Sequence, residues 1–284
     1  MIRIDAHQHY WSLRRGDYAW LTPRETGLYR DFEPEHLSQD LAQCGIRATV
    51  SVQAAPTEAE SRFLFDLSVR HPSIAGIVGW VDFEADDVAE RINSLVRDGR
   101  GMLKGLRPMV QDIGDPGWLD RRGLDAAFEA MILHDLAFDA LVTPTHLGAI
   151  GRRLRRHPQL RAILDHAGKP DIGGANLEAW AAQIGELARE TRVFCKLSGL
   201  LTQAGRGARI DEIDAAAARV FECFGVERLI WGSDWPVVTL RATYREWLQM
   251  SLELVRRHAP GGEDAIFGAN AVDFYRLEVA AESA

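Results

Sequence analysis

The chain of 284 residues has only three cysteines, Cys44, Cys195 and Cys223, and no two of them form a CxxC pair. This scarcity excludes a disulfide scaffold and a zinc ribbon, which need more cysteines at closer spacing. Basic residues are in the minority, because 33 Lys and Arg face 41 Asp and Glu and leave a net charge of −8. Such a balance argues against nucleic-acid binding, which relies on attraction to phosphates, so we expect a small-molecule partner.

Long apolar runs are also missing. None reaches the roughly 18 residues that a membrane-spanning helix needs, and the N-terminus shows no signal-peptide core. The sequence contains neither a GxSxG elbow nor a P-loop, which disfavours serine-hydrolase and nucleotide-phosphate chemistry. No linker or low-complexity tract divides the chain. We therefore expect one cytoplasmic domain over residues 1–284 with no membrane partner, and the oligomeric state is left open.

Eight short runs rich in β-branched and apolar residues are present, and most are separated by stretches of helical spacing. The predicted strands are Ile2–His9, Thr49–Ala55, Ile74–Asp82, Met102–Met109, Leu136–Thr143, Arg161–His166, Arg192–Gly199 and Arg228–Asp234. Between them, Thr57 and Glu60 predict a capping box, while Pro34 and Gly45 predict the first turn and the end of a helix. This alternation favours an α/β fold, a closed (β/α)8 TIM barrel, over an open doubly wound sheet.

About 25 residues separate the first predicted strand from the helix that begins near Pro34. This segment contains five large apolar residues, Trp11, Tyr18, Trp20, Leu21 and Tyr29. A long loop inside a compact domain is usually functional or disordered, and the aromatic content argues against disorder. We expect the segment to cap the C-terminal face of the barrel, and the alternative is an accessory patch against the outer helices.

Two histidines stand at the end of the first predicted strand. Because strand side chains alternate between faces, His7 and His9 point to the same side, about 7 Å apart along the strand. The carboxyl ends of barrel strands form the face where ligands bind, so both imidazoles are expected at the inner rim. The alternative is a pair of unrelated histidines on an exposed strand.

Two more polar side chains end later strands: His166 closes the sixth and Asp234 the eighth. A closed barrel places strand eight beside strand one, so Asp234 becomes a neighbour of His7 and His9. One carboxylate among three imidazoles can ligate a metal ion, orient a water molecule or act as a general base. The plainer alternative is that Asp234 caps a loop.

Several segments at these strand ends resemble a known group of enzymes. They are His7-x-His9, Asp165-His166-x-Gly168-Lys169-Pro170, Lys196-Leu197-Ser198-Gly199, Gly232-Ser233-Asp234-Trp235-Pro236 and Gly268-Ala269-Asn270-Ala271-x-x-Phe274-Tyr275. Together they resemble the amidohydrolase superfamily, and within it the amidohydrolase-2-type TIM-barrel hydrolases, over nearly the whole chain. They are most similar to the branch that opens sugar lactones, which includes L-fuconolactonase-like and L-rhamnonolactonase-like enzymes, with pyrone-dicarboxylate lactonases close by.

The resemblance also bears on a metal cofactor. The set of His7, His9, His166 and Asp234 suits one divalent ion, and zinc fits it best. Metal-dependent relatives usually add a ligand on strand four or a histidine ending strand five, but the fifth predicted strand ends Leu-Val-Thr-Pro here. Since some similar lactonases work without a metal, we expect an ion to bind and leave open whether activity requires it.

Cationic and aromatic side chains near the same rim are candidates for substrate binding. The expected polar contacts are Arg107, His146 and Lys169, and the expected apolar walls are Trp11, Trp20 and Trp235. The alternative for Arg107 is a salt bridge at the rim, and Lys104 on the same strand could reach the mouth instead. Lys196 lies within an apolar strand and needs a partner, so it lines either the site or a structural ion pair.

The resemblance implies that the chain hydrolyses a sugar-acid lactone such as an L-fuconolactone-like aldonolactone. In this hypothesis Asp234 takes a proton from the attacking water, while His7, His9 and His166, directly or through a bound ion, stabilise the oxyanion. The alternatives are a metal-dependent amidase or esterase, a decarboxylase of the same superfamily, and a barrel that binds a sugar acid without turnover.

Overall fold

The computed structural model describes residues 2–205 and 209–279, and it contains one sheet of eight parallel strands that pair in chain order. The strands are β1 (Arg3–Gln8), β2 (Ile46–Val52), β3 (Ile74–Gly79), β4 (Leu103–Leu106), β5 (Ala137–Ala140), β6 (Ala162–Leu164), β7 (Phe194–Leu197) and β8 (Leu229–Trp231). Each overlaps a predicted strand. Only β2 begins earlier than predicted, at Ile46, because the exposed Arg47 interrupts the apolar run in the sequence.

The last strand returns to the first. Gln8 and Trp235 form a parallel bridge, the amide of His9 donates to the carbonyl of Trp235 at 2.7 Å, and the amide of Asp234 donates to the carbonyl of His7 at 2.8 Å. The sheet is thereby closed into a barrel, which confirms the predicted (β/α)8 fold. Closure also brings Asp234, which follows β8, next to His7 and His9 at the end of β1.

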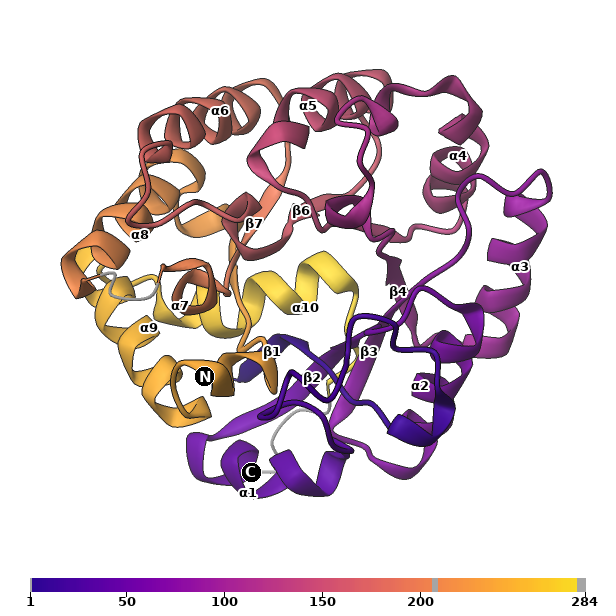
Figure 1. Ribbon diagram of the computed structural model, residues 1–284, viewed down its shortest axis with the longest axis horizontal. Coiled ribbons are helices and arrows are strands. Elements are labelled where there is room, and N and C mark those ends of the chain that lie inside the picture. The colour runs from indigo at the N-terminus through magenta and orange to yellow at the C-terminus, as the bar shows by residue number, and fades with distance from the viewer. Residues whose placement is uncertain (1, 206–208, 280–284) are drawn as a thin grey trace.

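A ring of helices surrounds the strands, as Figure 1 shows. The ring consists of α1 (Pro34–Cys44), α2 (Glu58–Arg70), α3 (Val88–Gly99), α4 (Asp125–Leu133), α5 (Leu147–Arg156), α6 (Leu177–Glu190), α8 (Ile210–Phe224) and α9 (Tyr244–His258), while the short α7 (Leu200–Gln203) and α10 (Asn270–Tyr275) lie inside it. As predicted, Pro34 opens α1 and Gly45 ends it, with a left-handed φ of 66°. Among residues 2–205 and 209–279, no helix is both long enough and apolar enough to cross a bilayer.

Two apolar cores hold the barrel. The larger core lies between the strands and the surrounding helices. The smaller core joins buried residues of the strands, such as Ile4 and Val50, to Ala271, Phe274 and Tyr275 of α10. In Figure 1, α10 accordingly lies near the centre of the ring and not in it. Helix α10 therefore packs against the barrel strands, and Tyr275 places its hydroxyl 2.7 Å from the Asp139 carboxylate of β5.

The loop of residues 9–33 is ordered by buried polar contacts. It passes in front of the strands and reaches α2 (Figure 1). There, Tyr18 donates its hydroxyl to Glu60 at 2.8 Å. The predicted capping box forms only by half: Thr57 accepts from the amide of Glu60, but the Glu60 carboxylate turns away to accept from the amide of Ala54 at 3.0 Å. Burial raises the pKa of Glu60 to about 7.

Candidate active site

A cavity of about 350 Å³ opens beyond the carboxyl ends of the strands. The described residues that line it are His9, Trp20, Ala54, Arg107, Met109, Gln111, Asp112, Leu141, His166, Lys169, Thr202, Gln203, Asp234, Val237 and Leu240. The lining combines charged and hydrogen-bonding side chains with apolar surface from Trp20, Leu141 and Leu240. Such a volume is at the lower end for small-molecule sites and suits a single sugar-sized ring.

His7 and His9 lie on the same side of β1, as the strand alternation predicts. Their ring centroids are 4.9 Å apart, and both side chains are buried. The Nδ1 of His9 is 2.8 Å from the carbonyl oxygen of Val52. Because a carbonyl only accepts, Nδ1 carries the ring proton and the Nε2 of His9 is left with a free lone pair in the neutral ring.

Asp234 lies among three imidazoles. Its Oδ1 is 3.4 Å from the Nε2 of His9 and 3.9 Å from the Nε2 atoms of both His7 and His166. His166 and Asp234 each have a left-handed backbone, with φ of 51° and 59°. Residues other than glycine rarely adopt this backbone conformation, and where they do, it is often at functional sites. The structure therefore brings together the four residues that the sequence proposed as catalytic.

Two glycines of the sequence motifs make room for these rings. A Cβ at Gly232 would lie 2.6 Å from the Cβ of His7, and one at Gly199 would lie 2.6 Å from the Cβ of His166. Gly199 also has a φ of 69°. Both positions need glycine because a histidine from a neighbouring strand end lies too close to leave room for a Cβ.

Burial favours the neutral form of two imidazoles of the site, those of His7 and His166. It lowers the pKa of His166 to about 4, and it lowers the pKa of His7 well below its ordinary value with help from the Lys196 charge. Burial alone would raise the pKa of Asp234, but the neighbouring His166, His9 and His7 lower it by more, so this carboxyl stays ionised. Neutral rings beside one carboxylate can exchange protons with a bound water or substrate near neutral pH.

A second layer of charged groups lies beneath the cavity, and the sequence analysis gave no role to two of its members, Asp139 and Asp165. The Nζ of Lys196 is 2.5 Å from Asp139 Oδ2, 2.9 Å from Asp165 Oδ1 and 2.9 Å from His7 Nδ1. All of these side chains are fully buried. Of the two roles that were left open, Lys196 takes the ion pair: it is not among the described residues that line the cavity, although it contacts His7 from below. In the sequence, Asp139 could have been noticed as the one carboxylate within an otherwise apolar strand.

Two of the predicted cations reach the cavity. Arg107 is held by Gln53, whose backbone and side-chain oxygens accept from Nη2, and its Nη1 lies 3.7 Å from Asp165 Oδ2. Lys169 lines the cavity and donates to Gln111 Oε1. Burial lowers the pKa of Lys169. Lys104 instead points away from the site and donates to the carbonyl of Arg276 at 3.0 Å.

Of the remaining predicted substrate contacts, some line the cavity and some do not. Trp20 lines the cavity and donates its indole N–H to the carbonyl of Ala54 at 2.7 Å. Trp11, Trp235 and His146 are buried and are not among the described residues that line the cavity. Trp11 packs edge-on against Trp20, at 5.4 Å between centroids, so it supports the wall from behind. The sequence did not indicate Gln111, Thr202 and Gln203, since isolated polar residues outside a motif give no signal.

The donor set at the cavity floor fits a divalent ion. One ligand atom each from His7, His9 and Asp234 lie within 4.8 Å of one another. The Nε2 of His9 and the Oδ1 of Asp234 face each other at 3.4 Å, and both carry lone pairs, so a proton or a cation between them is favourable. His166, the fourth ligand expected from the sequence, is not part of this group, although its Nε2 lies 3.9 Å from Asp234 Oδ1.

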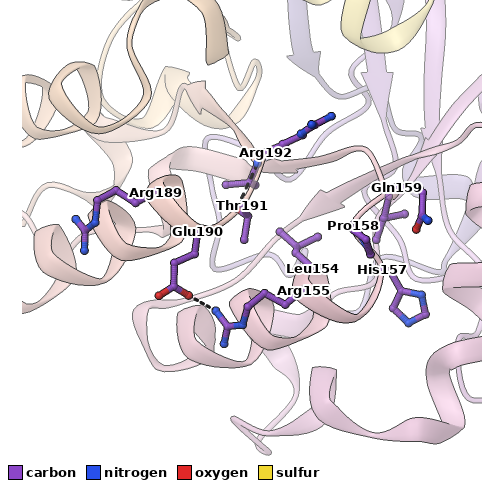
Figure 2. Close-up of a pocket in the computed structure, with 11 residues that line it drawn as sticks. Leu154, Arg155, His157, Pro158, Gln159, Arg189, Glu190, Thr191 and Arg192 are labelled. Atoms are coloured by element: carbon purple, nitrogen blue, oxygen red, sulfur yellow. Dashed lines mark hydrogen bonds and ion pairs between the residues drawn. The ribbon is translucent and has the colours of Figure 1, made fainter.

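A larger cavity, of about 520 Å³, lies at the opposite ends of the strands, between α5 and α6 (Figure 2). Its lining includes Arg155 and Glu190, which pair with each other, and His157, whose ring points away from these two residues (Figure 2). Catalytic sites of TIM barrels lie at the carboxyl ends of the strands, and this cavity is on the other face. The candidate active site is therefore the cavity that His9, His166 and Asp234 line.

Comparison with known proteins places the chain in a family. The sequence pattern of the amidohydrolase family matches residues 4–277. A protein of Burkholderia ambifaria named L-fucono-1,5-lactonase is 43% identical over 281 residues, which cover 98% of this chain and 96% of that one. A protein of Burkholderia multivorans with the same name is 34% identical over 301 residues, covering 99% and 98%.

Solved structures agree with this grouping. The crystal structure of an amidohydrolase from Burkholderia multivorans with bound zinc superposes with a TM-score of 0.90 at 34% identity, covering 98% of this chain and 100% of that one. A probable 2-pyrone-4,6-dicarboxylic acid hydrolase from Acinetobacter baumannii shares the fold, with a TM-score of 0.78 at 17% identity, and covers 98% and 100%. With a family match along nearly its whole length, and relatives of this identity, the chain belongs to the amidohydrolase family.

Proposed function

We propose that the protein is a lactonase that hydrolyses a sugar-acid lactone of the L-fuconolactone class, with Asp234 as the general base. The observation that carries this proposal is the arrangement of one ionised carboxylate among three buried imidazoles at the floor of a sugar-sized cavity. The two relatives named L-fucono-1,5-lactonase, at 43% and 34% identity, support the same substrate class.

The reaction begins with a water molecule beside Asp234. The carboxylate accepts one water proton while the water oxygen forms a bond to the lactone carbonyl carbon. Negative charge then develops on the carbonyl oxygen, where the imidazoles and the guanidinium of Arg107 stabilise it. Arg107 is suited to this because Gln53 and Asp165 hold it rigidly at the cavity wall.

Collapse of the tetrahedral intermediate breaks the bond between the carbonyl carbon and the ring oxygen. The proton held by Asp234 passes to that ring oxygen, which becomes a hydroxyl, so Asp234 returns to its ionised state. The product is an open-chain sugar acid, which releases the second water proton to solvent at neutral pH. The reaction therefore acidifies the medium by one proton for each lactone opened.

The polyol part of the substrate is held by other residues of the cavity lining. Lys169 and Gln111 are linked by a hydrogen bond and present a cation and an amide to sugar hydroxyls. Trp20 is 38% exposed and offers an apolar face beside them. Correct orientation of the lactone ring beside Asp234 accelerates the reaction, because the entropy cost of bringing substrate and water together is met when the substrate binds.

The same floor can hold a divalent ion. His7, His9 and Asp234 are the residues that would bind it, with His166 nearby, and zinc accepts such nitrogen and oxygen ligands. A bound ion would supply Lewis-acid polarisation of the carbonyl. The zinc-containing amidohydrolase structure at 34% identity supports this part of the proposal.

The proposal is tested with purified protein, a pH indicator and a panel of aldono-1,4-lactones and aldono-1,5-lactones, before and after treatment with a chelator. We expect acid release from lactones of the L-fucono or L-galacto type. The Asp234→Asn variant is the matched control for contaminating activity. No acid release from any lactone, with zinc restored, would contradict the proposal and direct the search to amides and carboxylic acids.

A further inference from the structure

A buried lysine lies directly under the catalytic histidines and has no place in the reaction described above. Lys196 on β7 is fully buried, and its ammonium is within 3 Å of three groups: Asp139 on β5, Asp165 after β6, and the Nδ1 of His7 on β1. Burying a lysine is costly unless its charge is matched. Here the arrangement connects four different strands at one point.

The partners of Lys196 form a cation site in their own right. One ligand atom each from His7, Asp139 and Asp165 lie within 4.8 Å of one another, which is the spacing of a metal-binding group. The ammonium of Lys196 lies among these atoms. Two carboxylates and one ring nitrogen are thus satisfied by a cation that belongs to the chain itself.

The same contact determines which nitrogen of His7 carries the proton. An ammonium only donates, so the 2.9 Å contact from Lys196 makes Nδ1 of His7 an acceptor and leaves the proton on Nε2. The competing contact, from Nδ1 to Asp165 Oδ1, is longer at 3.4 Å. Arg107 Nη1 lies 3.5 Å from Nε2, and a guanidinium only donates, so this contact favours the opposite tautomer; the Lys196 contact is 0.6 Å shorter and is the stronger of the two.

His7 and His9 therefore present opposite groups to the cavity although they lie on one strand. His9 donates from Nδ1 to Val52 and turns a lone pair towards Asp234. His7 accepts at Nδ1 and turns an N–H towards the same carboxylate, at 3.9 Å. One imidazole is ready to accept a proton or bind a cation, and the other is ready to donate a hydrogen bond.

We propose that Lys196 is a positioning residue that acts as a built-in cation beneath the catalytic floor and holds His7 as a hydrogen-bond donor to the reacting carbonyl oxygen. This role rests on the proposed lactonase function, which it refines. It also opposes metal ligation by His7, because Nε2 can bind an ion only after the ring proton moves to Nδ1, against the ammonium. A divalent ion at the floor thus competes with a charge that the fold supplies.

The first test needs neither substrate nor metal. Long-range proton–nitrogen NMR spectra of protein labelled with ¹⁵N-histidine distinguish protonated from unprotonated ring nitrogens, and the His7→Gln variant assigns the His7 signals. We expect an unprotonated Nδ1 and a protonated Nε2 for His7, and the reverse for His9. A protonated Nδ1 on His7 in the metal-free wild type would overturn the proposal, whatever the activity towards lactones.

The second test uses Lys196→Met, which keeps most of the length of the side chain and removes the ammonium group with its charge. We expect kcat without metal to fall by about tenfold to hundredfold, as is typical when a supporting partner of a catalytic histidine is lost, while KM changes little. Zinc affinity, measured by calorimetry, is expected to rise by about tenfold or more, since His7 is then free to ligate.

Tyr275→Phe is the matched control. Tyr275 donates to the same Asp139 oxygen that Lys196 contacts, and within the described part of the chain it forms no hydrogen bond with His7. A loss of stability alone would affect both variants, but only Lys196→Met should change the His7 proton position, kcat and zinc affinity. Equal losses of kcat in both variants, with unchanged NMR signals and zinc affinity, would reduce Lys196 to a structural ion pair. If Lys196→Met does not fold, the wild-type NMR measurement still decides.

Discussion

Replacing Asp234 by asparagine should remove the base and leave the fold intact. Position 234 has a φ of 59°, in the left-handed region that asparagine tolerates better than any other residue apart from glycine. The new amide group can donate to the free Nε2 of His9, which lies 3.4 Å from Oδ1 in the wild type. No cavity is created, because the two side chains have the same shape.

The expected loss of activity follows from the role of the carboxylate. A positioned general base contributes about a hundredfold to ten-thousandfold, or about 3 to 5 kcal/mol of barrier. We therefore expect kcat of Asp234→Asn to fall by at least about a hundredfold, with a melting temperature close to that of the wild type. The assay is indicator-monitored acid release at saturating lactone, together with thermal unfolding of both proteins.

Asp234→Ala serves as the comparison. Alanine at a left-handed position costs about 1 kcal/mol, so this variant should lose both activity and stability, whereas Asp234→Asn loses activity alone. A kcat of Asp234→Asn within tenfold of wild type would refute the assignment. Water activation would then have to come from another group at the floor.

Three further predictions concern the surroundings of the site. Trp20→Ala should raise KM by roughly tenfold, equivalent to 1.4 kcal/mol, with little change in kcat, while Tyr29→Ala in the same loop, outside the cavity lining, should leave both unchanged. Gly232→Ala should lower kcat and destabilise the fold by about 1 to 3 kcal/mol, measured by urea unfolding, because its Cβ would meet His7 at 2.6 Å; wild-type values would contradict this close approach. The pKa of Glu60 is about 7 in the folded protein against an ordinary 4.5, so the folded state binds this proton more tightly than the unfolded state does. The protonated Glu60 therefore contributes fully to the stability of the fold below pH 4.5, and this contribution is lost as the pH rises through 7. Glu60→Gln should reduce this decline by on the order of 3 kcal/mol between pH 4.5 and 8, and a slope equal to that of the wild type would contradict it.

Strand periodicity predicted most of the fold because it is a local property of the chain. All eight strands were found, and closure of the barrel then placed Asp234 beside His7 and His9. Local pattern could not show which side chains pair across strands. The link from Lys196 to His7 joins positions 189 residues apart, and nothing in the spacing of either strand indicates it.

The aromatic loop shows a similar limit. Its apolar content correctly predicted an ordered segment, but only Trp20 of its large residues lines the cavity. Trp11 and Tyr18 are buried instead, and Tyr18 is fixed by a hydrogen bond to Glu60 on α2. The composition of a loop reports that it packs, whereas the choice of which ring faces the ligand depends on contacts made in three dimensions.

The position of α10 has a consequence for synthesis of the protein. Its Tyr275 reaches the Asp139 carboxylate, and Asp139 holds the lysine that contacts His7 near the start of the chain. The first strand therefore cannot acquire its finished environment until the final helix has left the ribosome. A nascent chain that stops short of residue 275 leaves the small core inside the barrel without Phe274 and Tyr275. Catalytic competence should thus appear late and all at once during translation, and it should be absent from chains that end before α10.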